Sequence, residues 1–219
     1  MKISVPIDII LKLVSIAENS STNWKKQINY IEDIKDGRGY TISIVGFCTG
    51  TGDFIQVLRE IQKLDNNHVL VKFIPLVEKV DGSDSVKGLE SLPSVMNSIG
   101  INNTIFNQAM WNIIYKLYWG PALDFCSKKK INSQLSHYIA YDTILNFGNL
   151  NDFKNIIDTN ETSFLTKFLI IKQQKIKDGN YGNSKNNRVD MQKFILSTKN
   201  FNLNKPIKVS CYGDDFIIN

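Results

Sequence analysis

Apolar residues near the start of the chain recur with the spacing of an α-helix. Residues 10, 13, 14 and 17 are apolar and follow one another at i, i+3, i+4 and i+7, which predicts an amphipathic helix with one buried face. Asp8 and Lys12 interrupt the apolar run, so an amphipathic helix explains this segment better than a signal sequence does. We expect Glu18 to lie at the C-terminal edge of the helix, where the core meets a cleft.

A short strand-like pattern follows the polar break at residues 19–23. The residues around Ile28–Glu32 are compatible with an extended strand, and Asp36-Gly37 is a tight-turn signal. Residues 40, 42 and 44 then alternate with residues 41, 43 and 45. This pattern predicts a hairpin or a short sheet directly after Asp36.

The rest of the chain is predominantly helical in pattern. Glycines at 46, 50 and 52 mark a loop, and Thr51 or Asp53 is placed to cap a helix over residues 54–64. Further helices are predicted at about 69–80, 104–117, 122–129, 133–147, 162–177 and 188–198, with loops near 81–94 and 179–187. We therefore expect an α+β fold that is mainly α with one small sheet, and a cleft lined by the first helix, the sheet and later helices.

Composition and cysteine usage narrow the class of protein. The chain has 219 residues, of which 42% are hydrophobic, enough for one globular domain or for two lobes around a cleft. We treat residues 1–219 as a single domain of two lobes. Three widely spaced cysteines allow one disulfide at most, and the two histidines lack a metal-ligand spacing, so we expect no metal and no other cofactor. A run of about 20 apolar residues is absent from the sequence, so we expect no membrane span.

The positive charge is unevenly distributed. The net charge is +5, but residues 17–54 hold five acidic and four basic residues, a local net of −1, which leaves +6 for the remainder. The lysines elsewhere have few aromatic residues among them, so a platform for stacking bases is missing and we expect no nucleic-acid partner.

Glu18 and Asp36 are the candidate chemical groups. Two carboxylates on separate rigid elements across a cleft are what an acid/base glycosidase needs, because one protonates the leaving oxygen and the other activates water. Apolar helix residues beside Glu18 favour its protonated form, whereas Asp36 in a polar turn should stay ionised. The glycine-rich loop is not a phosphate cradle, because it lacks the Lys-Ser/Thr of a P-loop and because Asp53 would repel phosphate.

Several motifs in order along the chain resemble the chitosanases of glycoside hydrolase family 46. These are ENSS at 18–21, Trp24, YIEDIKDGRGYT at 30–41, GFCTGTGD at 46–53, Tyr141-Asp142, NRVD at 187–190 and Tyr212-Gly213-Asp214. The resemblance is dense from about residue 13 to 84 and follows the same order over nearly the whole chain. It implies a lysozyme-like fold of two lobes and an endo-acting, inverting hydrolase of β-1,4-linked glucosamine polymers.

The resemblance also implies roles for single residues. The general acid falls on Glu18, the general base on Asp36, and the threonine that helps to hold the attacking water on Thr41. Substrate contacts fall on Asn19, Tyr30, Arg38, Gly46, Thr51 and Asp53, the last of these binding a glucosamine amine. An ion network that reaches the acid falls on Asp142, Lys172 and Arg188. A lysine replaces the planar fork of an arginine at 172, which predicts a weaker network.

The acidic residues of the first quarter suit a polycation, because chitosan carries ammonium groups. We expect chitosan or its oligosaccharides as the partner, and a secreted or cell-surface monomer, with any leader absent from this sequence. Trp24, Tyr30 and Tyr40 are candidates for contacts between rings and sugars, although isolated aromatic residues more often belong to the core. Two rival functions remain: a lysozyme-like glycosidase acting on chitin or peptidoglycan, and a polysaccharide-binding protein without activity.

Overall fold

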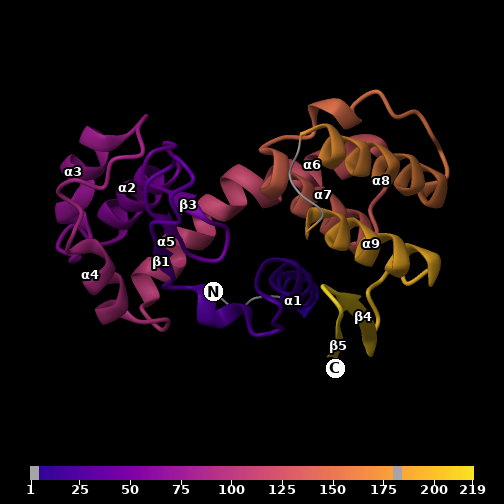
Figure 1. Cartoon of the computed structure of the whole chain (residues 1–219), viewed down its shortest axis with the longest axis horizontal. Helices are drawn as coiled ribbons and strands as arrows, with labels where there is room; N and C mark the ends of the chain where they lie inside the picture. The colour runs from indigo at the N-terminus through magenta and orange to yellow at the C-terminus, as the bar shows by residue number, and fades with distance from the viewer. Residues whose placement is uncertain (1–4, 180–183) are drawn as a thin grey trace. The chain divides into compact units, whose positions relative to one another are not determined.

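The computed structural model describes residues 5–179 and 184–219. Over these residues the chain is mainly helical with two small antiparallel sheets. It divides into two compact units. The first comprises Trp24–Leu117, and the second comprises Tyr118–Asn219 together with the N-terminal segment up to Asn23. The elements of each unit can be followed in Figure 1.

A three-stranded sheet and a set of short helices make up the first unit. Its elements are η1 (Trp24–Gln27), β1 (Ile31–Glu32), β2 (Thr41–Ile42), β3 (Phe47–Cys48), α2 (Phe54–Leu64), η2 (Val71–Phe73), α3 (Ile74–Val80), α4 (Leu92–Ile99) and α5 (Thr104–Ile114). The strands follow the order β1-β2-β3, with Ile31 paired to Ile42 and Thr41 paired to Cys48. The apolar face of α2, including Phe54, packs in a core that α5 shares, so the loop before α2 has a rigid base.

The second unit is built around α7. Its elements are α1 (Val5–Asn19), the last two residues of the π-helical turn η3 (Tyr115–Trp119), α6 (Gly120–Lys129), α7 (Gln134–Phe147), η4 (Asn151–Phe153), α8 (Glu161–Asp178), α9 (Ser184–Ser197), β4 (Ile207–Cys211) and β5 (Asp214–Ile218). α7 is buried along most of its length and contacts α6, α9 and α1. The β4–β5 hairpin packs on α9 and α1. Glu18, Asp142 and Arg188 are therefore carried by three helices of one core.

Most predicted helices are confirmed, with shifts of a few residues at their ends. Glu18 is the last residue but one of α1, as the apolar spacing predicts. Asp53 caps α2 by accepting a hydrogen bond from the backbone N–H of Phe54, as expected. Among the described residues, we find no helix with both the length and the apolar character that a membrane span requires.

Four predictions about local structure are wrong. The expectation of one sheet missed β4–β5, although Ile207, Val209 and Cys211 alternate with exposed residues and the turn at Tyr212-Gly213 has two positive φ angles. The predicted helices do not include α4 (Leu92–Ile99), whose first turn contains Pro93 and occupies residues 92–94 of the predicted loop. The alternation over 40–45 overestimated β2, which ends at Ile42 because Ser43 turns the chain with a φ of 66°. Of the predicted loop at 179–187, residues 180–183 lie outside the described residues, and α9 already begins at Ser184.

Candidate active site

Asp36 sits in a turn that is fastened to the end of β3. The backbone N–H of Tyr40 donates to the hydroxyl of Thr49 at 3.0 Å, and the N–H of Thr49 donates back to the carbonyl of Tyr40 at 3.1 Å. The N–H of Gly50 donates to the carbonyl of Arg38 at 3.0 Å. These hydrogen bonds hold the exposed Asp36 on a fixed backbone rather than on a free loop.

Two glycines make this turn possible because other atoms take the space of their missing side chains. A Cβ atom at Gly39, whose φ is 73°, would overlap the hydroxyl of Thr49. A Cβ atom at Gly50 would overlap the backbone carbonyl oxygen of Ser83. The glycines of this segment therefore serve close packing between three loops.

The carboxylate of Asp36 is paired with the guanidinium of Arg38. The Nε atom of Arg38 donates to Oδ2 of Asp36 at 2.8 Å, and Nη2 donates to the same oxygen. The hydrogen bond to Asp36 raises the pKa of Arg38 above its ordinary value. Asp36 and Arg38, both predicted as site residues, are thus brought together in the structure.

Asp53 is part of the glycine-rich loop itself. Its Oδ1 atom accepts hydrogen bonds from the backbone N–H groups of Cys48 and Phe54, both at 2.8 Å, and from the hydroxyl of Thr51 at 2.9 Å. Burial raises the pKa of the Asp53 carboxyl, while these donors act in the opposite direction. The contacts give Asp53 a structural function in addition to the substrate contact that the resemblance implies.

The aromatic residues that are candidates for contacts with sugar rings differ in how deeply they are buried. The hydroxyl of Tyr30 donates to Glu32 at 2.7 Å, and burial raises the pKa of Tyr30 to about 12. Trp24 is buried and packs edge to face against Trp111, with 5.9 Å between the ring centroids. Trp24 is therefore a core residue, whereas Tyr30 and Tyr40 are only partly buried.

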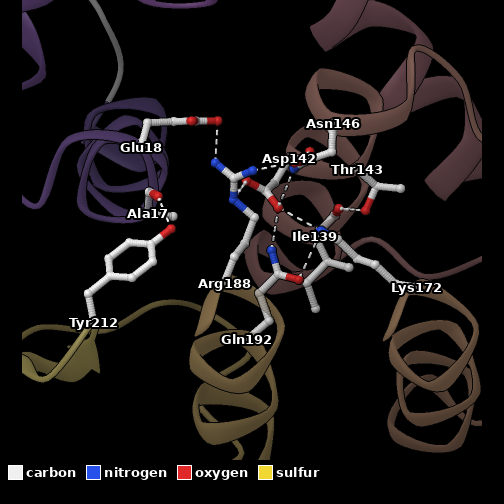
Figure 2. Close-up of polar contacts among 10 residues, drawn as sticks. All are labelled: Ala17, Glu18, Ile139, Asp142, Thr143, Asn146, Lys172, Arg188, Gln192 and Tyr212. Atoms are coloured by element: carbon white, nitrogen blue, oxygen red, sulfur yellow. Dashed lines mark hydrogen bonds and ion pairs between the residues drawn. The ribbon is translucent and has the colours of Figure 1, made fainter. Parts of the chain in front are cut away.

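In the second unit, Glu18 is held by Arg188. Figure 2 shows the guanidinium of Arg188 between the carboxylates of Glu18 and Asp142. Its Nη2 donates to Glu18, and its Nε lies 3.1 Å from Oδ1 of Asp142, which is the predicted pairing of Arg188 with Asp142. The side chain of Glu18 is 48% exposed, so the apolar surroundings that the sequence suggested for it are not found.

Asp142 is the centre of a fully buried cluster. Its Oδ2 accepts from the ammonium of Lys172 at 2.6 Å and from the side-chain amide of Gln192 at 2.7 Å. Lys172 also donates to Oε1 of Gln192 at 3.1 Å (Figure 2). Lys172 and Gln192 therefore supply two converging donors to one carboxylate. The planar guanidinium group of an arginine can supply two such donors by itself.

The charges of this cluster compensate one another. Burial by itself would raise the pKa of Asp142, but Arg188 and Lys172 together hold it below its ordinary value. Burial lowers the pKa of Lys172 to about 8, against the attraction of Asp142. Burial opposes the charge of Arg188 as well, but Asp142 and Glu18 raise its pKa above the ordinary value. The network is a chain of alternating charges that ends at the exposed Glu18.

Sequence reasoning missed three residues of this network. Gln192 follows Arg188 by one helical turn, and Asn146, which accepts from Arg188, follows Asp142 by one turn. The i, i+4 spacing is a signal that could have found both. Tyr212 donates from its hydroxyl to the carbonyl of Ala17 at 2.9 Å, which satisfies a free carbonyl in the last turn of α1. No local pattern indicates that contact.

The predicted site residues fall into two groups. The first unit carries Tyr30, Asp36, Arg38, Thr41, Gly46, Thr51 and Asp53. The second unit carries Glu18, Asn19, Asp142, Lys172 and Arg188. Within residues 5–179 and 184–219, His, Cys, Asp and Glu side chains do not gather into a group of three or more that could hold a metal ion. Of the predicted site carboxylates, Asp36 in the first unit and Glu18 in the second are each exposed and paired with an arginine, and carboxyl groups are suited to proton transfer.

Comparison with known proteins places the whole chain in one group. The sequence profile described as Glycosyl hydrolase family 46 matches residues 12–207. A chitosanase of Nocardioides sp. is 35% identical over 97% of this chain and 81% of the relative. A chitosanase of Bacillus subtilis is 29% identical over 94% of this chain and 83% of the relative.

Solved structures agree with this assignment. The GH46 chitosanase of Gynuella sunshinyii, in complex with chitotetraose, has a TM-score of 0.87 and 25% identity, and covers 100% of this chain and 99% of its own. A native chitosanase of Bacillus subtilis has a TM-score of 0.85 and 27% identity, with 98% of each chain covered. The mainly helical fold with a small antiparallel sheet is thus similar to that of these proteins.

Proposed function

Since the chain belongs to glycosyl hydrolase family 46, we propose that it hydrolyses β-1,4 linkages between glucosamine units inside chitosan chains. The match over residues 12–207 carries the proposal. It is supported by relatives that are chitosanases and by a structural neighbour that is in complex with chitotetraose. Glu18, Asp36 and Thr41 are all present, which argues against a binding protein that has lost its activity.

The proposed mechanism divides proton transfer between the two units. Glu18 gives its proton to the glycosidic oxygen, and Asp36 takes a proton from a water molecule whose oxygen attacks the anomeric carbon from the opposite face. The anomeric configuration is then inverted, and the product is an α-anomer. Thr41 holds the attacking water.

Asp36 is suited to the role of base by its position. Its turn is exposed and polar, and the hydrogen bond from Arg38 fixes the orientation of the carboxylate. The hydrogen bonds between Tyr40 and Thr49 keep the turn in place, so the carboxylate does not have to be ordered again in each cycle.

The acid role of Glu18 rests on its family position and not on burial, because the side chain is half exposed. Arg188 holds the Glu18 carboxylate at the end of α1, and Tyr212 ties the same turn of α1 to the β4–β5 hairpin. We propose that these contacts hold the side chain of Glu18 in the position that a general acid requires.

Substrate preference follows from charge. Glu32, Asp33, Asp36 and Asp53 belong to the segment from β1 to the start of α2, where they attract the ammonium groups of glucosamine units. Because the substrate is a polymer that is degraded outside cells, we extend the proposal to a secreted enzyme in which the two units are the lobes of one catalytic domain.

The proposal is tested by digesting well-deacetylated chitosan and following the anomers of the first products by proton NMR. We expect a rapid loss of viscosity, as internal bonds are cleaved, and α-anomers as the initial products. Initial β-anomers would contradict inversion. Turnover of chitin or peptidoglycan without turnover of chitosan would establish the rival glycosidase, and binding without any turnover would establish the binding protein.

A further inference from the structure

Cys48 lies directly opposite Thr41 in the small sheet. β2 and β3 are antiparallel, and their register pairs Thr41 with Cys48 and Ile42 with Phe47. Side chains of directly opposed residues lie on the same face of a sheet, and successive residues point to opposite faces. The fully buried Ile42 and Phe47 occupy the core face, so Thr41 and Cys48 share the other one.

The donor and the acceptor can be assigned in both hydrogen bonds of the Cys48 thiol. Its Sγ donates to the carbonyl oxygen of Gly46 at 3.2 Å and lies 3.8 Å from the hydroxyl oxygen of Thr41. A thiol has one hydrogen, and burial raises the pKa of Cys48, which keeps that hydrogen on the sulfur. Because the thiol hydrogen is used on Gly46, the hydroxyl of Thr41 is the donor in the second contact and the sulfur is its acceptor.

The side chain of Thr41 directs its hydroxyl to Cys48. Its methyl group is on the side of Gly46, 3.4 Å from the place that a Cβ atom of this glycine would occupy. A β-branched side chain has few allowed χ1 values, so the hydroxyl of Thr41 has few other directions in which to point. The charges of Arg38, Asp53 and Asp36 also act on the pKa of the Cys48 thiol, so Cys48 belongs to the same part of the candidate site.

We propose that Cys48 is a positioning residue that makes the hydroxyl of Thr41 an acceptor of a hydrogen bond from the attacking water. This inference rests on the proposed function. With its own hydrogen directed to the sulfur, the Thr41 oxygen presents lone pairs to the water. The water then donates one hydrogen bond to Thr41 and one to Asp36, and a lone pair on its oxygen is free to attack the anomeric carbon. Asp36 removes its proton as the new C–O bond forms.

A double-mutant cycle tests the coupling between the two side chains. We measure kcat and KM on chitosan for the wild type, Cys48→Ala, Thr41→Val and the double variant. Cys48→Ala is expected to lower kcat about 3- to 10-fold with KM nearly unchanged, the effect of one hydrogen bond. In the Thr41→Val background the same change is expected to cost nothing further, because the hydroxyl that Cys48 orients is gone.

Controls separate positioning from packing. Cys48→Val also removes the acceptor but fills the space of the thiol and adds one methyl group, so a folding defect of Cys48→Ala that comes from a cavity does not prevent the test. Cys126→Ala removes another buried free thiol, on α6, and its effect on kcat should be small and the same in both backgrounds. The infrared S–H stretch that disappears in Cys48→Ala should have a lower frequency than that of Cys126, as expected for a thiol that donates.

The outcomes are distinct. Equal losses of kcat on changing Cys48 in the wild type and in the Thr41→Val background, or an S–H band without a shift, would overturn the role of Cys48 while leaving the chitosanase proposal in place. Absence of chitosan turnover by the wild type would overturn both.

Discussion

Arg188 on α9 donates a hydrogen bond to Glu18 on α1, a residue 170 positions earlier in the chain (Figure 2). The arginine is almost fully buried, whereas the glutamate is half exposed. The same guanidinium contacts the buried Asp142. A surface carboxylate is thus joined to an ionic cluster inside the second unit, and the two ends of this connection should respond differently to mutation.

Arg188→Met should lower the free energy of unfolding by about 3 to 5 kcal/mol, because it leaves Asp142 buried with one cation fewer. Urea unfolding at pH 7 measures the change. The matched control is Arg59→Met, which removes an exposed arginine from its pair with Glu78 and should cost about 1 kcal/mol or less. Equal effects of the two changes would mean that burial of the Arg188 pair is unimportant.

Glu18→Gln should reduce kcat on chitosan by roughly 10² to 10⁴-fold, because the amide is too weak an acid to protonate the leaving oxygen. Since the Glu18 side chain is half exposed, the unfolding midpoint should change little. Glu78→Gln is the control, because Glu78 is likewise a partly exposed glutamate paired with an arginine, and it should retain full activity. Wild-type activity of Glu18→Gln would remove the acid role.

Asp36→Asn should reduce kcat by a similar factor of about 10² to 10⁴, because the attacking water loses its base. Asp33→Asn is a close control, since Asp33 also pairs with a cation two residues further along, Lys35. The control should lose far less activity. Comparable losses in both variants would indicate a general effect of acidic charge on substrate binding and not a base at Asp36.

Gln192→Leu should lower the free energy of unfolding by about 1 to 3 kcal/mol, because Lys172 loses an acceptor and Asp142 loses a donor in a site without water contact. Gln174→Leu on α8 is the control, because Gln174 bonds Asp178 on an exposed helix face and its loss should cost about 0.5 kcal/mol or less. A neutral Gln192→Leu would show that the Lys172 and Asp142 pair needs no third partner.

Lys172 should make the stability of the protein depend on pH in an unusual direction. Burial lowers its pKa from the ordinary 10.5 to about 8, so between these pH values the unfolded chain binds a proton that the folded chain has released. The free energy of unfolding should therefore rise with pH across this window, by up to about 3 kcal/mol, relative to Lys172→Met, which cannot titrate there. Urea unfolding of both proteins from pH 7 to 10 measures the difference. A difference that is constant or falls with pH would contradict the lowered pKa.

Local features of the chain were predictable where the residues that determine them are neighbours. The first helix, the turn at Asp36-Gly37 and the Asp53 cap follow from spacing and residue type within about ten positions. The β4–β5 hairpin has an alternating pattern of the same kind over Ile207–Cys211, and this local signal was sufficient to predict it. The helix α4 was not predicted at all, because it is only eight residues long and follows a loop rich in Gly and Ser.

The sequence by itself therefore determined the helical character of the chain, the turn that carries Asp36 and, through its motifs, the family. Only the tertiary structure decided that Arg188 connects Glu18 to Asp142, that Gln192 completes the cluster with Lys172, and that Cys48 stands opposite Thr41. Periodicity records which side of an element faces the core. It does not record which polar atoms meet there, because partners such as Glu18 and Arg188 are chosen when helices far apart in the chain pack together and bury their charges.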